Sequence, residues 1–372
     1  MKSLLITAAL VMFFLAVQGE SKDIVKTGWN LGALPVIAYN SDLGLEYGLL
    51  LNLVDFGDGS HYPNYNRKLY LEASAYTKGS GIYRFYYDAP RFINNIRLIA
   101  DVSWLPDRAY DFLGFNGYEA VYNTSWEDQD APDYRTRMFY KYDRNLFRIK
   151  ADLQGKLKSS RVKWTAGLTS QTFDISAVDV DKLNKGKDEQ DRLPNVEGLY
   201  QKYLNWGFIP EGEKNGGHIL TAKAGLIYDS RDVIAAPNRG IWTEAVVVVS
   251  SEALASDFSF AKFSFTHRQY FPLMPNRLTL AYRLGYQTTF SGKTPFFYLP
   301  MIETSEMQAA KSEGLGGDRF TRGIRRNRII GEGIFFGNVE LRYKLLRFTA
   351  LKQNFYIGVN PFLDFGQVIK KA

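Results

Sequence analysis

The chain has 372 residues, of which 45% are hydrophobic, 15% aromatic and 23% charged, and it carries a net charge of +7 and no cysteine. The lack of cysteine excludes a disulfide scaffold, a thiolate metal site and a thiol nucleophile, and the aromatic content excludes a disordered chain. Because the basic excess is spread along the chain, we expect no nucleic-acid partner.

Residues 1–19 have the pattern of a secretory signal that is cleaved after Gly19. A single positive residue precedes an apolar run from Leu4 to Val17. This run is too short for a comfortable membrane span, and the alternative is an uncleaved N-terminal anchor. No later window approaches a run of about 18 apolar residues, so helical membrane spans are not expected. Residues 20–372 are predicted to form one domain.

Hydrophobic and polar residues alternate with a period of two along most of this domain. In the clearest segment, 147–157, Phe147 and Ile149 lie on one face, and Arg148 and Lys150 lie on the other. A strand separates these two sets, whereas a helix would mix them. The pattern predicts about 13 strands. They span 27–39, 42–54, 67–78, 81–88, 94–105, 145–157, 161–175, 218–229, 240–251, 257–270, 276–290, 332–346 and 353–367.

The connections between these strands differ in length in a regular way. The long ones, 106–144, 176–217 and 291–331, follow odd-numbered strands, and most even-numbered strands are followed by short turns. Outer-membrane barrels have short periplasmic turns and long outer loops. The only candidate for a short helix, 178–204, lies inside a long connection. The predicted fold class is therefore all-β, an antiparallel transmembrane β-barrel of the outer-membrane type.

A secreted β-sandwich or propeller is the soluble alternative, because alternation alone fits it as well. The strands are longer than those of most globular proteins, and no blade-length repeat supports a propeller. Aromatic residues near the strand ends are expected to form interfacial girdles. These residues are Trp29, Trp104, Trp164, Trp242, Tyr270 and Phe271.

Three local motifs narrow the prediction further. The first has the composition of a turn between two strands. The second is an Arg-Gly pair in the last long connection, and the third is a pair of segments on the two strands that follow it. In order, they are Asp229, Arg231, Asp232, Pro237, Arg239 and Gly240; Arg322 and Gly323; and 337–342 with 362–366.

Together these motifs resemble the membrane barrel of the BamA/TamA superfamily, also called the bacterial surface antigen family. The resemblance implies a barrel of sixteen strands whose sixth outer loop folds back into the lumen. The family's loop tip carries an Arg-Gly pair, usually preceded by Val and followed by an aromatic residue. Here Thr321 and Ile324 flank the pair, so both flanks differ. The family arginine pairs with acidic residues on the next two strands, and the matching positions are Glu340 and Asp364.

Strand parity supports the same assignment. Glu340 shares the polar face of its strand with Arg342, and Asp364 lies opposite the apolar side chains that flank it. Both carboxylates are therefore expected to face the lumen, where one guanidinium could bridge them. We predict a lumen lock made of Arg322, Gly323, Glu340 and Asp364.

Two features depart from the family. The first predicted strand begins too close to the cleavage point to leave room for a periplasmic POTRA domain. The strand count is odd, and the chain ends without a terminal aromatic strand, so about three C-terminal strands are predicted to be missing, unless the count is wrong. In the first strand, Pro35 favours an edge position or the barrel rim.

The favoured function is outer-membrane protein assembly in bacteria, by insertion or translocation of client polypeptides through a deformable barrel seam. The expected partners are outer-membrane lipids, client outer-membrane or secreted polypeptides, and accessory periplasmic or lipoprotein subunits. No cofactor, metal or enzymatic activity is expected, because the three histidines lie far from any nucleophile signature. The alternative function is a passive outer-membrane channel or a structural barrel without insertase activity.

Overall fold

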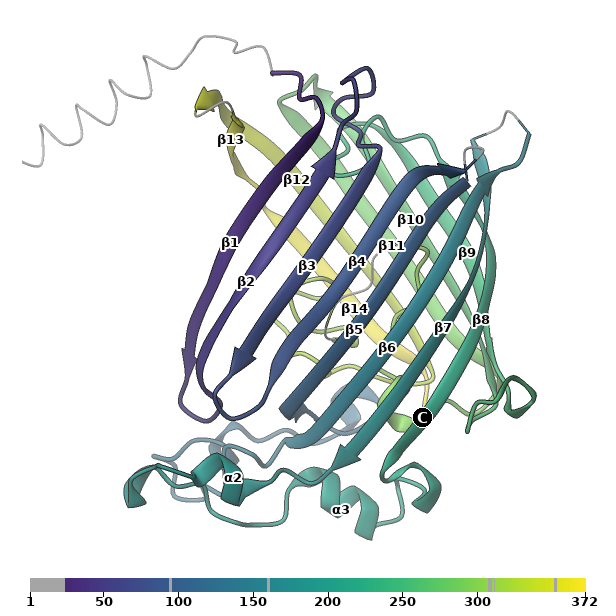
Figure 1. The fold of residues 1–372 in the computed structure, drawn as a ribbon. Coiled ribbons are helices and arrows are strands. Elements are labelled where there is room, and N and C mark those ends of the chain that lie inside the picture. Colours follow the sequence, from purple (N-terminus) through teal and green to yellow (C-terminus); the bar gives the residue numbers. More distant parts are fainter. Residues whose placement is uncertain (1–23, 94–95, 159–160, 307–309, 311, 351–352) are drawn as a thin grey trace, which may run out of the picture.

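The computed structural model describes residues 24–93, 96–158, 161–306, 310, 312–350 and 353–372. The predicted signal and its cleavage point lie outside these residues. Figure 1 shows one strongly curved sheet of long strands. The strands are β1 (Trp29–Asn40), β2 (Gly44–Asp55), β3 (Arg67–Tyr76), β4 (Gly81–Ile93), β5 (Ile96–Asp111), β6 (Lys141–Lys156), β7 (Val162–Ser176), β8 (Gly216–Asp229), β9 (Gly240–Ser250), β10 (Phe260–Met274), β11 (Leu278–Gly292), β12 (Gly333–Ala350), β13 (Gln353–Val359) and β14 (Phe362–Lys370).

Each strand from β1 to β13 pairs with the next one in the chain, and the pairings are antiparallel. β14 also pairs with β12, so β13 and β14 lie along the two ends of the same neighbour. The strand predicted over 353–367 is therefore divided in two. The division falls at Pro361, which has no N–H to donate, although its carbonyl still accepts the N–H of Leu341 at 3.0 Å.

The three long loops, 112–140, 177–215 and 293–332, follow β5, β7 and β11 and lie at the same end of the sheet. Among the described residues, the α-helices are α2 (Val180–Asn184) and α3 (Leu199–Asn205), and both belong to the second of these loops (Figure 1). In the part of the chain that the structure describes, no helix is long and apolar enough to cross a membrane.

The two faces of the sheet have the reverse of the burial found in a soluble protein. On β6, the apolar side chains of Phe147 and Ile149 are 45% and 47% exposed, while Arg148 and Lys150 are 1% and 3% exposed. The apolar face thus points outward and the charged face lines the lumen. A soluble sandwich would bury the apolar face. This arrangement confirms the predicted all-β, outer-membrane type of barrel sheet.

The sheet is not closed among the described residues, because no ladder joins β1 to β13 or β14. The two edges meet only near the end with the short turns. There the side-chain amide of Asn354 accepts the N–H of Ile24 at 3.0 Å and donates to its carbonyl at 3.1 Å. The inward face of β1 is apolar between Gly32 and Ala38, and Leu34 on this face is 63% exposed.

The aromatic residues that were predicted to form girdles do not all lie on the outer face of the sheet. Trp29, Trp104 and Phe271 are exposed on the outside, but Trp242 and Tyr270 are 2% and 8% exposed and point inward. For these two residues the prediction was wrong. Proximity to a strand end does not fix the face of a side chain, whereas strand parity does.

An aromatic cluster joins the three long loops at their end of the lumen. Phe112 from the first loop packs edge-to-face on Tyr203 of the second loop, with ring centroids 5.2 Å apart, and on Phe296 of the third at 6.0 Å. Tyr140 and Tyr200 belong to the same buried cluster. We call this cluster the aromatic cap, and it holds the three loops together.

The exposed apolar face predicts a measurable cost of placing charge on it. Ile149→Arg, in the middle of β6, should lower the free energy of unfolding from lipid vesicles by about 2–4 kcal/mol, because the guanidinium would enter hydrocarbon. Leu157→Arg, beside the end of the same strand, should cost less than about 1 kcal/mol. Urea titration of both variants measures the difference. Equal stabilities would mean that the outward face meets water.

Candidate functional site

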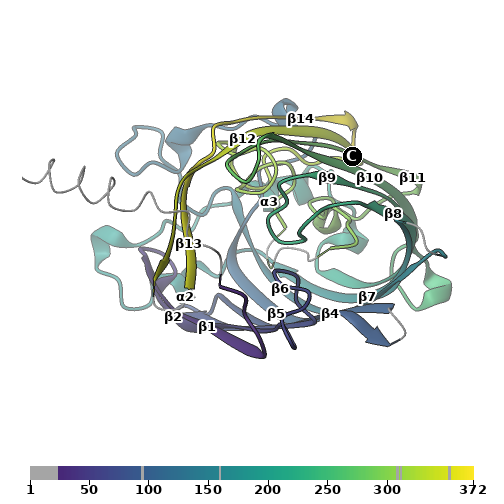
Figure 2. The same ribbon diagram turned by 90° about the horizontal axis from the view of Figure 1, so that it is seen from above.

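The loop 293–332 leaves β11 and turns back into the space enclosed by the strands (Figure 2). Its two ends are fastened to each other. The N–H of Thr294 donates to the carboxylate of Glu332 at 2.8 Å, and the N–H of Thr289 on β11 donates to the Glu332 carbonyl at 2.9 Å. The loop therefore starts and ends at one point of the wall and projects its middle into the lumen.

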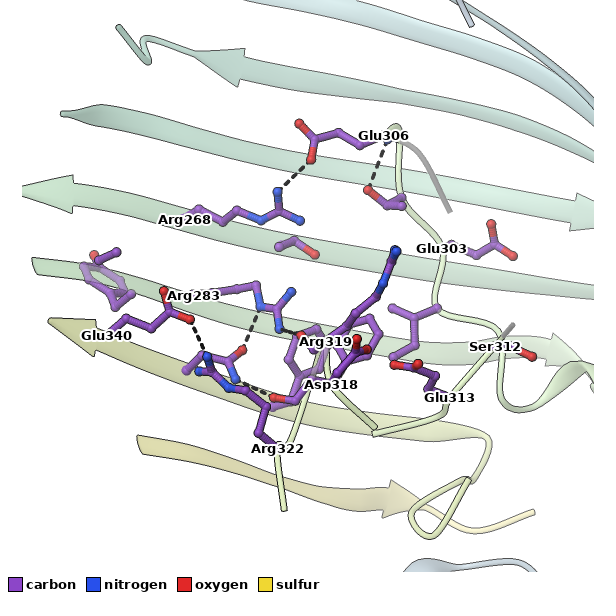
Figure 3. A pocket seen from close by; sticks show the side chains of 18 of the residues that line it. Arg268, Arg283, Glu303, Glu306, Ser312, Glu313, Asp318, Arg319, Arg322 and Glu340 are labelled. Atoms are coloured by element: carbon purple, nitrogen blue, oxygen red, sulfur yellow. Dashed lines mark hydrogen bonds and ion pairs between the residues drawn. The ribbon is translucent and has the colours of Figure 1, made fainter. Parts of the chain in front are cut away.

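The tip of this loop places Arg322 between the carboxylates of Asp364 and Glu340, and Figure 3 shows the contact with Glu340. Its Nε and Nη2 donate to the two oxygens of Asp364 at 2.7 and 2.8 Å, and its backbone N–H donates to the same carboxylate at 3.0 Å. Its Nη1 donates to Glu340 at 2.8 Å. The structure thus brings together the predicted arginine and both predicted anions. A planar guanidinium can satisfy both because its donors form a fixed fork.

The register of β12 and β14 positions these anions. Asn338 on β12 lies opposite Asp364, and its amide donates to that carboxylate at 2.6 Å. The Phe365 ring covers Gly337, where an added Cβ would lie 2.2 Å from the ring. Only glycine permits this close contact, so the pair keeps the two strands in register. Glu340 is also shared with Arg342, whose Nε lies 2.7 Å away.

Each inward residue of the Phe-x-Asp-x-Gly segment has a different task. The Phe362 ring lies 3.6 Å from the guanidinium carbon of Arg322, as a cation–π contact. Asp364 supplies the bidentate carboxylate. At Gly366 a Cβ would lie 3.0 Å from Leu315 and 3.2 Å from Thr321, so the absence of a side chain lets the loop approach β14.

The tip makes hydrophobic contacts through Phe320, outside the family pattern, and through Ile324, at the position where the family has an aromatic residue. Phe320 packs edge-to-face on Phe336 of β12, with centroids 5.1 Å apart. Ile324 packs on the buried cluster that contains Leu315. Thr321 is itself buried, and Gly323 has a φ of +85°, which turns the chain after the arginine. The tip is docked although both residues that flank Arg-Gly differ from the family's.

A second attachment of the loop has the opposite polarity. Glu306 accepts from Arg268 of β10 at 2.7 Å and from Arg231 at 3.1 Å (Figure 3 shows the first contact). Arg231 is also paired with Asp229 at 3.0 Å, and Asp229 with Lys163 at 3.0 Å. The loop therefore offers a cation to anions of β12 and β14, and an anion to cations on β10 and directly after β8.

The predicted turn motif thus divides into two parts. Asp232 organises the turn, because its carboxylate accepts the N–H groups of Val233 at 2.9 Å and Asn238 at 3.1 Å. Pro237 is buried, Arg239 is exposed, and Gly240 has a φ of +105°. Arg231 instead reaches the lumen, which the sequence analysis missed. The available signal was parity, because Arg231 continues the inward face of β8 after Asp229.

The lumen wall around the loop is lined by paired charges. Asp152 on β6 accepts from Lys150 at 3.0 Å and from Lys223 of β8 at 2.6 Å, and all three side chains are at most 5% exposed. A cavity of about 400 Å³ lies between the loop and the inward faces of β10 to β12 (Figure 3). In the described part of the chain, no three side chains of His, Asp or Glu are grouped so that they could hold a metal ion.

Comparison with known proteins finds one matching family profile and structures with a similar fold. The sequence profile of the Omp85 superfamily domain matches residues 100–372. BamA from Haemophilus ducreyi lacking POTRA domains 1–3 aligns with a TM-score of 0.50 and 16% identity, over 93% of this chain and 58% of that chain. CdiB from Escherichia coli aligns with a TM-score of 0.54 and 10% identity, over 94% and 54%. The chain spans less than two thirds of either structure, and no curated protein matches it.

The Arg322 contacts predict a loss of stability when the guanidinium is removed. Arg322→Ala should lower the free energy of unfolding in detergent by about 2–4 kcal/mol, less than for a fully buried pair because a quarter of the arginine side chain is exposed. Urea titration measures this change. Arg325→Ala on the same loop, where the side chain is 53% exposed, is the matched control and should cost less than about 1 kcal/mol. Similar losses in both variants would contradict the assigned importance of Arg322.

The loop should also respond to pH through Glu313. Burial, followed by repulsion from Asp318, raises the pKa of Glu313 to about 7 from its ordinary value of 4.5. The docked loop therefore holds a proton that a released loop gives up, so docking is strongest below about pH 4.5 and weakens as the pH rises through 7. A spin label on Arg325→Cys, in a chain without other cysteines, should become more mobile from pH 5 to pH 8.

The matched control for this measurement is the same labelled chain with Glu313→Gln, whose mobility should not change with pH. A pH response that persists in the Glu313→Gln chain would assign the effect to another group.

Proposed function

The chain belongs to the Omp85 superfamily, and from this premise we propose that it assists the insertion or translocation of client polypeptides in the bacterial outer membrane. The observation that carries the proposal is the loop held in the lumen by Arg322, Glu340 and Asp364. A passive pore needs an open passage and gains nothing from a loop fastened across it. A barrel that must change shape around a client does need a releasable internal brace.

In the proposed mechanism, the free edges of the sheet act on the client. An unpaired edge strand offers its N–H and C=O groups to any extended chain and can template a new strand. β1 is such an edge, and Pro35 and Gly32 within it weaken its ladder to β2. Asn354 tethers the opposite edge to the segment before β1, which keeps the two edges near each other while they separate elsewhere.

The partners in this proposal follow from the surfaces. The exposed apolar face of the strands is expected to contact outer-membrane lipids, and the client is an unfolded outer-membrane or secreted polypeptide. Accessory periplasmic or lipoprotein subunits would deliver it. No covalent step is involved, because the work consists of exchanging main-chain hydrogen bonds between barrel and client.

The alternative of an open channel has less support. The loop 293–332 and the aromatic cap occupy the lumen and its long-loop end, so steady conductance should be small. Planar-bilayer recording of the protein without client checks this prediction. A large and stable conductance in that recording would favour a pore.

The proposed activity is tested with purified protein in lipid vesicles and a urea-unfolded outer-membrane barrel as client. Vesicles that contain the protein should fold the client several-fold faster than empty vesicles. Arg322→Ala should return the rate toward that of empty vesicles, because the brace is lost, and Arg325→Ala should keep the acceleration. No acceleration by the unaltered protein would contradict the proposed function.

A further inference from the structure

Residues 301–306 of the lumen loop form neither helix nor strand and bend at Ser305 and Glu306, and we call this segment the strap. It follows the short 3₁₀ turn Phe296–Tyr298 under the aromatic cap and ends at Glu306. Along this length its main-chain groups contact side chains that point inward from the wall. At the loop tip, wall side chains also bind main-chain groups, but the tip is fastened in addition by the guanidinium of Arg322.

Gln287 of β11 forms hydrogen bonds with two main-chain groups of the strap. Its Nε2 donates to the Met301 carbonyl at 2.9 Å, and its Oε1 accepts the N–H of Glu303 at 2.8 Å. On β10, the hydroxyl of Ser264 donates to the Glu303 carbonyl at 2.9 Å. A primary amide that both donates and accepts reproduces the pairing offered by a neighbouring strand.

The main-chain groups of the next strap residues form hydrogen bonds with side chains of three other strands. Lys223 of β8 donates to the Thr304 carbonyl at 3.1 Å. Glu244 of β9 accepts the N–H of Ser305 at 2.9 Å, and Gln154 of β6 donates to the Ser305 carbonyl at 2.8 Å. Five strands thus each supply one side chain that forms a hydrogen bond with the main chain of the strap, and all five side chains are buried. We call this set the wall array: Gln154, Lys223, Glu244, Ser264 and Gln287.

Recognition through main-chain groups does not depend on the sequence that is recognised. Buried loops must satisfy their backbone groups, usually by turns within the loop. Here the partners belong to the wall and follow one another along residues 301–305, as they would in a site for the main chain of a peptide. The cavity of about 400 Å³ lies directly beside Ile302 and Thr304, so the strap has free space next to it.

The end of the strap is fastened mainly by the charge of Glu306, whose carbonyl also accepts from Lys150 of β6 at 3.5 Å. Glu306 pairs with Arg268 and Arg231. Its side chain is 23% exposed, whereas the side chains of the wall array are buried. Neutralising this one carboxylate would weaken the fastening without changing the wall array. A substitution at Glu306 can therefore loosen the strap while the side chains of the wall array stay in place.

We propose that the wall array is a binding site for the main chain of an extended polypeptide, and that the strap occupies this site as an internal ligand. The inference rests on the proposed function, because a client polypeptide would be the occupant that displaces the strap. The substrates of the lumen would then be extended chains of variable sequence. Residues 301–306 of the same chain would compete with them for the wall array.

A labelled synthetic peptide of residues 300–306 is the probe, and the full-length protein in detergent is the receptor. Fluorescence anisotropy should show binding to Glu306→Gln at least about tenfold tighter than to the unaltered chain, whose own strap competes at high effective concentration. A scrambled peptide should bind within about threefold of the original, whereas N-methylation at the Glu303 and Ser305 amides should abolish binding.

Two glutamines provide matched variants in the Glu306→Gln chain. Gln287→Leu removes two hydrogen bonds to the peptide main chain and should reduce peptide binding by about tenfold or more. Gln171→Leu changes an equally buried glutamine of β7, whose amide nitrogen has no hydrogen-bond partner within the described residues, and should leave binding unchanged. If Gln287→Leu does not fold, Ser264→Ala removes one donor with little change in volume and should reduce binding several-fold.

Equal binding of the N-methylated and unmodified peptides would overturn the inference, as would equal effects of Gln287→Leu and Gln171→Leu. The peptide measurement needs no client and no membrane insertion. Peptide binding without any acceleration of client folding would contradict the proposed function only. Client folding without peptide binding would contradict the wall array only.

Discussion

The structure depends on one constraint, which is that a sheet whose apolar face points outward must turn its charged face inward. On β6 this places Arg148, Lys150 and Asp152 in the lumen, where water is scarce and each charge needs a partner. Many of these partners come from neighbouring strands, as Asp101 of β5 does for Arg148. Other inward groups are met by the loop that follows β11, as Gln287 is. The ion pairs and the docked loop are thus consequences of the same reversal of faces.

The loop is held by contacts of two chemical kinds. Its tip uses a charged side chain, Arg322, and a geometry that only a planar guanidinium and the Phe-x-Asp-x-Gly segment can form. Its strap uses main-chain groups, which are the same in every polypeptide. The tip therefore gives the loop a defined position, while the strap gives it a contact that other chains could replace. Glu306 lies at the boundary between them.

Much of the fold was predictable because strand parity is a local property. The segment 147–157 shows it fully, and the structure has β6 there with the expected faces. The family resemblance led to Glu340 and Asp364, and strand parity supported both; the structure shows their contacts with Arg322. The prediction that further strands follow the described ones stays a prediction.

What was missed depends on paths that alternation does not encode. The pairing of Glu306 with Arg231 requires the course of a long loop through the lumen, and no periodicity describes that course. Trp242 was assigned to the outside from its position along a strand, although its parity with Glu244 places it inside. The break at Pro361 was hidden within an otherwise continuous pattern. In each case a non-local contact or a single residue decided the outcome.

The first strand lacks the inward charges that fix the rest of the wall. Between Gly32 and Ala38 its lumen side carries only small and aliphatic groups, with Leu34 largely exposed. Displacing this portion of the strand would break ladder bonds to β2 but would leave no ion unpaired in a dry interior. The electrostatic rigidity of the wall therefore stops short of this margin, and the margin can bend or peel away at a cost set by backbone pairing alone.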